Sequence, residues 1–363
     1  MEPIILPFEK ELFDSNQYKK YLKEQKQVSG YVPNSPETVP QKEPEPKNKK
    51  KKTYPQDWVT YNSYQMREKL MGYRLISDVV DFLQIEEKKK LGRPTVNLKD
   101  VLKSLCVKEF CGLSSRRLHS ELVLLKAMNY IENVYHFNTI CKYLGEPKIQ
   151  GYLKEIAILL ATPLREVETC VAIDSSGIST RRFAQKWSDI RQDFSAHREY
   201  KKLHILCGVR TGAIFSFDIT NGNEADSPFF KPLLSDAVKI FSIKDVCADA
   251  GYLSRDNCTF TEEVGARPFI LPKKNSTTHP KGSWAYARMV RMWKEKKELW
   301  NPLYHRRSKV ENTFFRIKIK YGEYVRGKLD QTQTNEIMCK IIAHNLGVLS
   351  QAMLQFGVQP GFW

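Results

Sequence analysis

The pattern of apolar residues changes near residue 166, and this change limits the fold more than any other feature of the sequence. Before it, apolar residues recur at helical spacing. After it, three short apolar runs follow one another, at Val171–Ile173, Leu203–Val209 and Ala213–Ile219. Such runs are typical of buried strands, and the pair Thr211-Gly212 between the last two marks a tight turn. We therefore expect an antiparallel meander in this part of the chain.

The segments after the meander complete an α/β domain. Residues Phe229–Phe241 have the pattern of a helix, and the chain is helical again from Trp284. Between them, Asp245–Asp249 and Pro268–Leu271 are short apolar runs typical of buried strands. The order of three strands, helix, strand, strand and helices is compatible with a ribonuclease-H-like fold, in which helices flank a mixed sheet. The sequence thus predicts a ribonuclease-H-like α/β domain over residues 166–355.

Residues 58–165 are expected to form an all-α region in front of that domain. Within it, Asn97 is placed to cap a helix, and Gly112 is placed to end it. A second helix is expected directly after this glycine, with Arg116 and Arg117 near its beginning. Two short helices joined by a glycine turn, the second led by basic residues, fit a helix-turn-helix that binds DNA. An αα-hairpin that binds nothing is the alternative.

Residues 1–57 are expected to be a disordered tail. Several prolines between Pro33 and Pro46 interrupt any helix, and the lysine run Lys49–Lys52 repels itself. Two interpretations remain open: a solubilising tail, and an arm that binds DNA without sequence preference.

The charge of the chain indicates a polyanionic partner. The formal net charge is +17, and each phosphate that Lys or Arg neutralises releases condensed counterions. A lysine-rich proteome or a solvated surface produces the same charge, so the charge alone does not identify nucleic acid as the partner.

The eight cysteines are scattered and contain no CxxC pair. We interpret them as buried free thiols in a reducing compartment. The N-terminus has no signal-peptide pattern, and no uninterrupted apolar run approaches the ~18 residues that a membrane span needs. These features predict a cytoplasmic protein without a membrane partner.

Two aspartates follow apolar strand-like runs and precede small residues. Asp174 follows Val-Ala-Ile and precedes Ser-Ser-Gly, whereas Asp249 follows Val-Cys-Ala and precedes Ala-Gly-Tyr. A carboxylate at a strand end stands on a rigid support, and divalent metals such as Mg²⁺ need hard oxygen ligands. Both aspartates are therefore candidate metal ligands. The alternative for each is an aspartate that simply begins a turn.

A third carboxylate lies in a segment with a polar stripe. If residues 304–318 form one helix, then at about 100° per residue Tyr304, Arg307, Glu311 and Lys318 fall within about 60° of one another. A face that packs on the core is apolar, so this face is either solvated or functional. An i,i+4 ion pair explains Arg307 and Glu311, but it explains neither the tyrosine nor the distant lysine.

The spacing of these four residues resembles a motif of insertion-sequence DDE transposases: Tyr, two residues, Arg, three residues, Glu, six residues, Lys. Ala248–Tyr252 resembles the second-aspartate motif of that family, and Thr220–Ser227 resembles the loop after its third strand. Weaker similarity extends to Gly92-Arg93-Pro94 and to the Arg116–Arg117 segment. Together these segments lie within residues 90–350.

The resemblance implies a DNA transposase that uses Asp174, Asp249 and Glu311 as ligands of Mg²⁺ or Mn²⁺. A first phosphoryl-transfer step would cleave DNA at the end of the transposable element. A second step would use the freed 3′-hydroxyl to attack another phosphodiester.

The same resemblance implies that Tyr304, Arg307 and Lys318 contact DNA phosphates near the scissile bond. Arg116 and Arg117 are the expected DNA contacts of the helical region. The expected partners are double-stranded DNA, both element ends and target, and further copies of this chain in a homo-oligomer on DNA. Bound to DNA, the protein would be associated with the nucleoid.

The sequence departs from the family in two places. Ala250 stands where a basic residue often precedes Gly-Tyr, and the interval from Asp249 to Glu311 is too short for the all-β insertion of some relatives. Two other functions fit the same residues. One is a ribonuclease-H-like nuclease or resolvase without strand transfer, and the other is a domesticated DNA-binding protein derived from a transposase. The presence of all three acidic residues argues against the second.

Several polar and aromatic residues near these motifs receive a structural interpretation. His204 is expected to be structural at a strand start, and Asp226 to cap the helix near Pro228 rather than to assist the site. Glu323 is a rival third carboxylate that lies outside the matched spacing. The aromatic residues among the basic residues 284–300 are expected to pack in the core rather than to stack on bases.

Overall fold

The computed structural model describes residues 57–85, 95–180 and 200–362. The chain divides into two units, Met1–Pro55 and Gln56–Trp363. The first unit lies outside the described residues, and with it almost all of the predicted tail. Asp57, the last residue of that tail, is described: its side chain accepts a hydrogen bond from the Thr60 amide at 3.0 Å and caps the first described helix.

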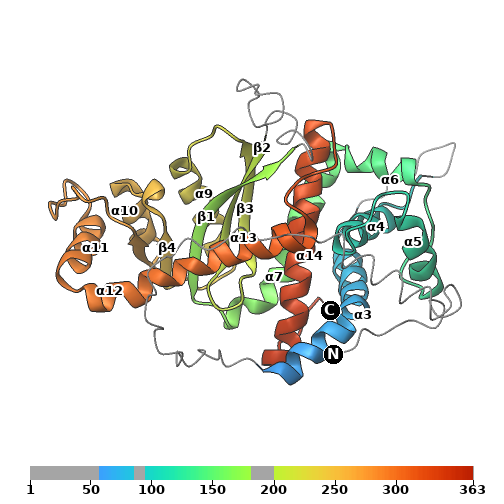
Figure 1. The fold of residues 1–363 in the computed structure, drawn as a ribbon, viewed down its shortest axis with the longest axis horizontal. Helices are drawn as coiled ribbons and strands as arrows, with labels where there is room; N and C mark the ends of the chain where they lie inside the picture. The colour runs from blue at the N-terminus through green and yellow to red at the C-terminus, as the bar shows by residue number, and fades with distance from the viewer. Residues whose placement is uncertain (1–56, 86–94, 181–199, 363) are drawn as a thin grey trace, which may run out of the picture. The chain divides into compact units, whose positions relative to one another are not determined.

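A five-stranded mixed sheet forms the centre of the second unit (Figure 1), with the strand order β3-β2-β1-β4-β5. β1 pairs antiparallel with β2, and β2 with β3. β4 instead runs parallel to both β1 and β5. The predicted meander is thus extended by two parallel strands, which confirms the ribonuclease-H-like α/β fold class. The strands are β1 (Cys170–Ser179), β2 (Tyr200–Gly208), β3 (Ile214–Asn221), β4 (Asp245–Ala248) and β5 (Arg267–Ile270).

The first strand is longer than its apolar run. The apolar run ends at Ile173, but β1 continues to Ser179 because its backbone pairs with β2 up to the Ser179–Tyr200 pair. The prediction that Asp174 stands at a strand end is therefore wrong, since Asp174 lies in the middle of β1. The same prediction is confirmed for Asp249, which directly follows β4.

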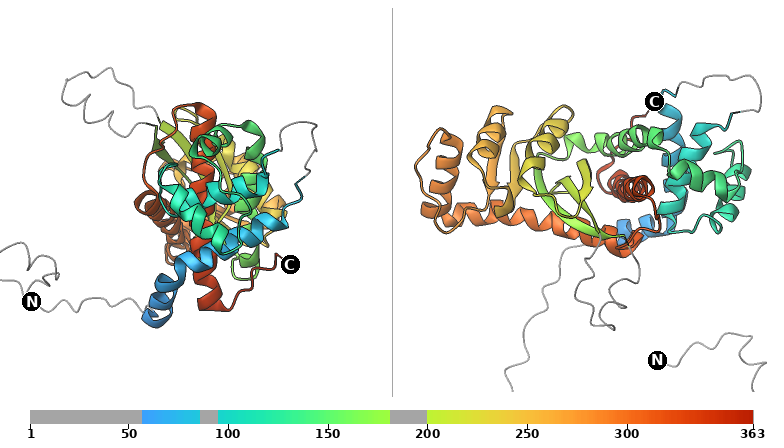
Figure 2. Two further views of the ribbon diagram at one scale, coloured as in Figure 1. Left: turned by 90° about the vertical axis from the view of Figure 1, so that its right-hand side faces the viewer. Right: turned by 90° about the horizontal axis from the view of Figure 1, so that it is seen from above.

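Helices cover both faces of the sheet (Figure 2). α13 contacts β1 and β2 on one face, and α7 and α9 contact β3 on the other. The helices of this unit are α3 (Trp58–Phe82), α4 (Leu98–Phe110), α5 (Leu118–Ala127), α6 (Phe137–Leu144), α7 (Gln150–Ala161), α9 (Phe230–Val238), α10 (Arg255–Glu263), α11 (Trp284–Glu295), α12 (Lys297–Tyr304), α13 (Ser308–Tyr321) and α14 (Asp330–Phe356).

The last helix, α14, packs against helices from both halves of the chain. Its neighbours are α3, α4 and α7, which precede the sheet in the sequence, and α13, which follows it. α14 has the length and composition of a membrane span, but 78% of its apolar stretch is buried inside the protein. Burial of this extent is typical of the core helix of a globular protein. α14 therefore joins the helical region and the sheet into one hydrophobic core.

The turn between α4 and α5 differs from the prediction. Asn97 caps α4 as expected, since its side chain accepts a hydrogen bond from the Asp100 amide at 3.2 Å. Gly112 ends the helix with a φ of 64°, which favours glycine. However, α5 begins only at Leu118. The prediction of a helix that starts directly after Gly112 is wrong, and the two arginines precede the helix in a turn.

The cysteines within the described residues are free, and most are buried. The interpretation as buried free thiols is confirmed for six of the eight cysteines. Cys111 is only half-buried, and the interpretation is wrong for Cys141, which is exposed on α6.

His344 of α14 makes the stability of this core depend on pH. Its Nε2 donates a hydrogen bond to the Gly212 carbonyl at 2.8 Å, in the turn between β2 and β3. Burial lowers the pKa of His344 to about 4 from an ordinary value of 6.5. The unfolded chain therefore takes up a proton before the folded protein does. The stability from this neutral histidine is complete above pH 6.5 and is lost as the pH falls through about 4.

We expect protonation of His344 to reduce the free energy of unfolding by about 3 kcal/mol between pH 7 and pH 4. The variant His344→Gln keeps an N–H donor for Gly212 but does not titrate, so its loss of stability over this range should be smaller by that amount. Urea denaturation of both proteins across the range measures the difference. His119→Gln, at an exposed position, is the control. Equal pH dependence of wild type and His344→Gln would contradict the prediction.

Candidate active site

The register of the sheet places the two aspartates side by side. β1 and β4 are parallel, and Ile173 pairs with Ala248. Asp174 follows Ile173 and Asp249 follows Ala248, so the two aspartates occupy equivalent positions on neighbouring segments. Adjacent strands lie about 4.8 Å apart. The two carboxylates therefore come from neighbouring backbone segments that the sheet holds rigidly.

Each aspartate is oriented by the peptide that follows it. The Ser175 amide donates to Oδ1 of Asp174 at 2.8 Å, and the Ala250 amide donates to Oδ1 of Asp249 at 2.7 Å. The same local contact at both positions fixes one carboxylate oxygen.

Arg307 connects the sheet to α13. Its Nη1 donates to Oδ2 of Asp174 at 3.2 Å, and its Nη2 donates to Oε1 of Glu311 at 2.6 Å. The side chains of Arg307 and Asp174 are 20% and 21% exposed, whereas that of Glu311 is 55% exposed. One planar guanidinium bridges both carboxylates, so Glu311 lies on the same face of the sheet as Asp174.

The pKa shifts of Asp174 and Arg307 reflect the charges around them. Burial raises the pKa of Asp174, and the charges of Asp249 and Glu311 raise it further, against the opposing effects of the Ser175 amide and Arg307. The pKa of Arg307 is raised although burial opposes the charge, because these carboxylates and Tyr304 surround it. Arg307 thus offsets a repulsion among three like charges.

The three carboxylates suit a divalent metal by chemistry, but in this arrangement they do not form a cage. Within residues 57–85, 95–180 and 200–362, no group of three or more His, Cys, Asp and Glu side chains is arranged to hold an ion. The contacts give the reason, since the Arg307 guanidinium lies between Asp174 and Glu311. A divalent cation prefers hard oxygen ligands, and its charge would relieve the repulsion among the three carboxylates.

The segment that carries the polar stripe is not one regular helix. α12 ends at Tyr304, His305–Arg307 form a 3₁₀ turn, and α13 begins at Ser308. The prediction of a single helix is wrong here. Residues three apart eclipse one another in a 3₁₀ turn, and the Arg307 guanidinium carbon accordingly lies 6.0 Å from the centre of the Tyr304 ring.

Lys318 extends the stripe along β1. Its Nζ donates to Oγ of Ser176 at 2.8 Å. Alternate residues of a strand point to the same face, so Asp174 and Ser176 both face α13. The stripe residues Tyr304, Arg307, Glu311 and Lys318 therefore lie along one side of the sheet despite the interruption.

Asp226 supports the site from the opposite face of β1. Its carboxylate accepts a hydrogen bond from Oγ of Ser175 at 2.6 Å and pairs with Nζ of Lys202 at 2.8 Å. The prediction that Asp226 caps the following helix is wrong, because its side chain makes no capping hydrogen bond. The signal that could have found this role is its position in the Thr220–Ser227 segment.

His204 behaves as a structural residue, although it lies inside β2 rather than at its start. It is fully buried and stacks on Phe229 with ring centres 4.2 Å apart. Its Nε2 lies 3.1 Å from Oγ1 of Thr220, and burial lowers its pKa.

The remaining candidates lie outside the carboxylate cluster. Glu323 is exposed, and its carbonyl accepts from the Ser179 amide at the far end of β1. The Arg116 guanidinium carbon lies 4.7 Å from the centre of the Phe137 ring, whereas Arg117 lines a cavity elsewhere.

Core packing is confirmed for Tyr286 and Trp300, which are buried together with Met289 and Val290. Trp293 is half-buried and packs against the core. Trp284 is 67% exposed, so the core-packing prediction is wrong for that residue.

The sheet and its acidic cluster define a ribonuclease-H-like protein with a three-carboxylate site. The family model described as "Transposase DDE domain" matches residues 165–346, half of the chain. The chain belongs to the transposase DDE domain family, and its function is of the transposase type. The matched residues include Asp174, Asp249 and Glu311. The search of curated proteins and the search of solved structures found no match.

Proposed function

We propose that this protein is a DNA transposase that cleaves DNA at element ends and joins the freed 3′-hydroxyl to a target phosphodiester. The observation that carries the proposal is the bridge of Arg307 between Asp174 and Glu311, with Asp249 in register beside them. A cationic side chain amid three carboxylates, from β1, the end of β4 and α13, supports a site that binds both a divalent metal and a DNA phosphate.

Asp174, Asp249 and Glu311 are the residues that would hold Mg²⁺ or Mn²⁺. Bound there, two divalent ions would activate the attacking oxygen and stabilise the leaving oxygen. The two aspartates offer rigid oxygens from adjacent strands. Glu311 stands on a helix and is more exposed, so it is the ligand with the most freedom to adjust.

Arg307 would change partners when DNA enters. A phosphodiester presents two oxygens to a guanidinium much as a carboxylate does. A DNA phosphate would therefore compete with Asp174 and Glu311 for the same N–H groups. As Arg307 turns to the phosphate, both carboxylates are released for other ligands. Tyr304 and Lys318 would contact the neighbouring phosphates.

The rest of the molecule is assigned roles in the same proposal. Residues 58–165 form a DNA-binding region that uses Arg116 and Arg117, and residues 166–355 form the catalytic domain. The formal charge of +17 supports a nucleic-acid partner. The chain acts as a homo-oligomer on double-stranded DNA, in the cytoplasm and at the nucleoid, without a membrane partner.

A strand-transfer assay separates the transposase from its alternatives. Duplexes taken from the DNA on either side of the gene serve as candidate element ends, and a supercoiled plasmid serves as the target. With Mg²⁺ we expect end cleavage and joined products, and no joined product from an end with a 3′-dideoxy nucleotide. A nuclease would cleave without joining, and a domesticated binding protein would bind without cleaving.

A further inference from the structure

A cavity of about 910 Å³ lies between the turn before α5 and the loop after α13. Its lining includes three cations and, among the described residues, no acidic side chain. The main polar side chains of the lining are Ser114 and Arg117 from the turn, Arg326 and Lys328 from the loop, and Gln333 from α14.

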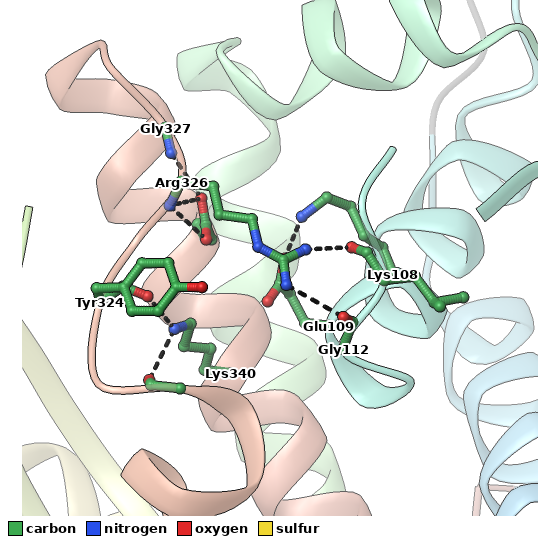
Figure 3. Close-up of polar contacts among 10 residues, drawn as sticks. Lys108, Glu109, Gly112, Tyr324, Arg326, Gly327 and Lys340 are labelled. Atoms are coloured by element: carbon green, nitrogen blue, oxygen red, sulfur yellow. Dashed lines mark hydrogen bonds and ion pairs between the residues drawn. The ribbon is translucent and has the colours of Figure 1, made fainter. Parts of the chain in front are cut away.

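Two charged residues of α14 hold the loop in place (Figure 3). The Glu336 carboxylate accepts hydrogen bonds from the amides of Arg326 and Gly327 at 2.9–3.0 Å. One turn later, Nζ of Lys340 donates to the carbonyls of Gly322 and Tyr324 at 2.9 Å and 2.6 Å. One face of α14 thus holds two backbone amides and two backbone carbonyls of this segment by hydrogen bonds.

Arg326 then closes the cavity against the helical region. Its guanidinium donates to the Leu113 carbonyl at 2.7 Å and to the Gly112 carbonyl at 3.1 Å. These contacts join the turn before α5 to the loop. The cavity wall is therefore built before any ligand arrives, so a ligand would not have to order it.

Among the described residues, no acidic side chain lines the cavity beside its three cations. Beneath the loop, the acids Glu109 and Glu336 are matched by Lys108 and Lys340. Arg326 donates its guanidinium hydrogen bonds to neutral carbonyls. Arg117 and Lys328 are exposed, and within the described part of the chain neither forms an ion pair.

The cavity lies in line with the carboxylate cluster. The amide of Val325 donates to the Ser179 carbonyl at 2.9 Å, so the loop pairs with the far end of β1. Thr180 at that end lines the cavity, six residues beyond Asp174. At about 3.3 Å per residue, this places the cavity about 20 Å from the cluster. Lys318, bonded to Ser176, lies between the two.

We propose that this cavity binds the DNA phosphodiester backbone about six base pairs from the scissile phosphate, since about 20 Å corresponds to about six steps of 3.4 Å. Arg117 and Lys328 contact the phosphates, and Arg326 positions the walls. The proposal rests on the proposed function for the identity of the ligand as DNA. A free phosphate would satisfy the same cations, but the alignment with Lys318 and Arg307 favours a polymer.

Binding measurements in EDTA test the cavity without any cleavage. The probe is an element-end duplex, titrated at several salt concentrations. We expect the double variant Arg117→Gln/Lys328→Gln to bind about tenfold more weakly. The slope of log Kd against log salt should fall by about 1.8, or about 0.9 for each phosphate that the protein no longer neutralises. Lys273→Gln/Lys274→Gln, which removes two charges from exposed positions after β5, is the matched control and should change neither quantity.

Single methylphosphonates in the duplex locate the contact. In the wild type, neutral phosphates about six base pairs from the element end should weaken binding, and in the double variant they should cost nothing further. Equal binding by wild type and by the Arg117/Lys328 variant, or equal weakening in Lys273→Gln/Lys274→Gln, would overturn the proposal. Sensitivity confined to phosphates at the cleavage site would do the same.

Two outcomes separate this site from its alternatives. Binding of inorganic phosphate that the double variant abolishes, with DNA binding unchanged, would make the cavity a small-anion site and overturn the proposal. A chain that shows the methylphosphonate pattern but never cleaves or joins DNA would retain the cavity as a DNA site, and only the proposed transposase activity would fail.

Discussion

Asp174→Asn, Asp249→Asn and Glu311→Gln should each reduce DNA cleavage about a thousandfold or more. Each amide keeps the shape of the carboxylate but removes the charge that a divalent metal requires. Asp174 in β1 and Asp249 directly after β4 follow the paired residues Ile173 and Ala248, so each has a fixed position and neither can replace the other. Cleavage of a labelled element-end duplex with Mg²⁺ under single-turnover conditions measures the effect.

DNA binding by the three variants in EDTA should remain within a few-fold of the wild type, because the cations of the stripe and of the cavity remain. Glu323→Gln is the matched control, since that carboxylate is exposed at the far end of β1, and it should cleave at the wild-type rate. Mg²⁺-dependent cleavage at full rate by any of the three variants would remove that residue from the ligand set.

The sequence predicts the central sheet well because hydrophobic burial and strand formation coincide there. The apolar runs at residues 171–173, 203–209 and 245–249 all lie in strands or directly beside them. Apolar patterning fails to predict a strand where backbone pairing continues past the apolar run. β1 extends to Ser179 through its pairing with β2, and the side-chain pattern of the sequence does not predict that extension.

The register between strands could not be predicted from the sequence. Asp174 and Asp249 lie side by side because Ile173 pairs with Ala248, a contact between segments that are distant along the chain. The contribution of Asp226 from the other face of β1 has the same origin. A local rule for helix caps gave the wrong role for that residue, because three-dimensional proximity to Ser175 and Lys202 outweighs it.

The helical region shows how the start of one helix changes the surroundings of a basic pair. Because α5 begins at Leu118 rather than just after Gly112, the two arginines lie in a turn and diverge. Arg116 packs over the Phe137 ring, and Arg117 faces the cavity. The expected helix predicts that both arginines contact DNA. Their contacts in the structure favour Arg117 for phosphate binding.

Arg307→Ala should slow the cleavage of bound DNA about a hundredfold, because under the proposed function it would remove the side chain that binds the reacting phosphate. Arg307→Lys should restore little of this rate. An ammonium is a point charge, whereas the guanidinium donates from two nitrogens to two carboxylates at once. The affinity for DNA should change much less than the cleavage rate, which single-turnover cleavage of prebound duplex separates from binding.

The pH profile gives a second readout for Arg307. In the wild type this cation opposes the rise in the pKa of Asp174 that burial and the neighbouring carboxylates cause. Without the cation, the pKa of Asp174 should rise further. Its carboxylate would then be protonated at a higher pH as acid is added, so cleavage by Arg307→Ala should decline at a higher pH than cleavage by the wild type.

Arg306→Ala is the matched control, since it removes the neighbouring guanidinium. Arg306 lies 3.6 Å from Asp245, which keeps a second partner in Arg267 at 2.7 Å. Its removal should leave both cleavage and the pH profile near the wild type. If Arg307→Ala matched the wild type as closely as Arg306→Ala, only Glu311 of the stripe would act in the reaction. The other three stripe residues would then form a solvated helix face. If weaker binding alone explained the slower reaction, Arg307 would not act on the reacting phosphate.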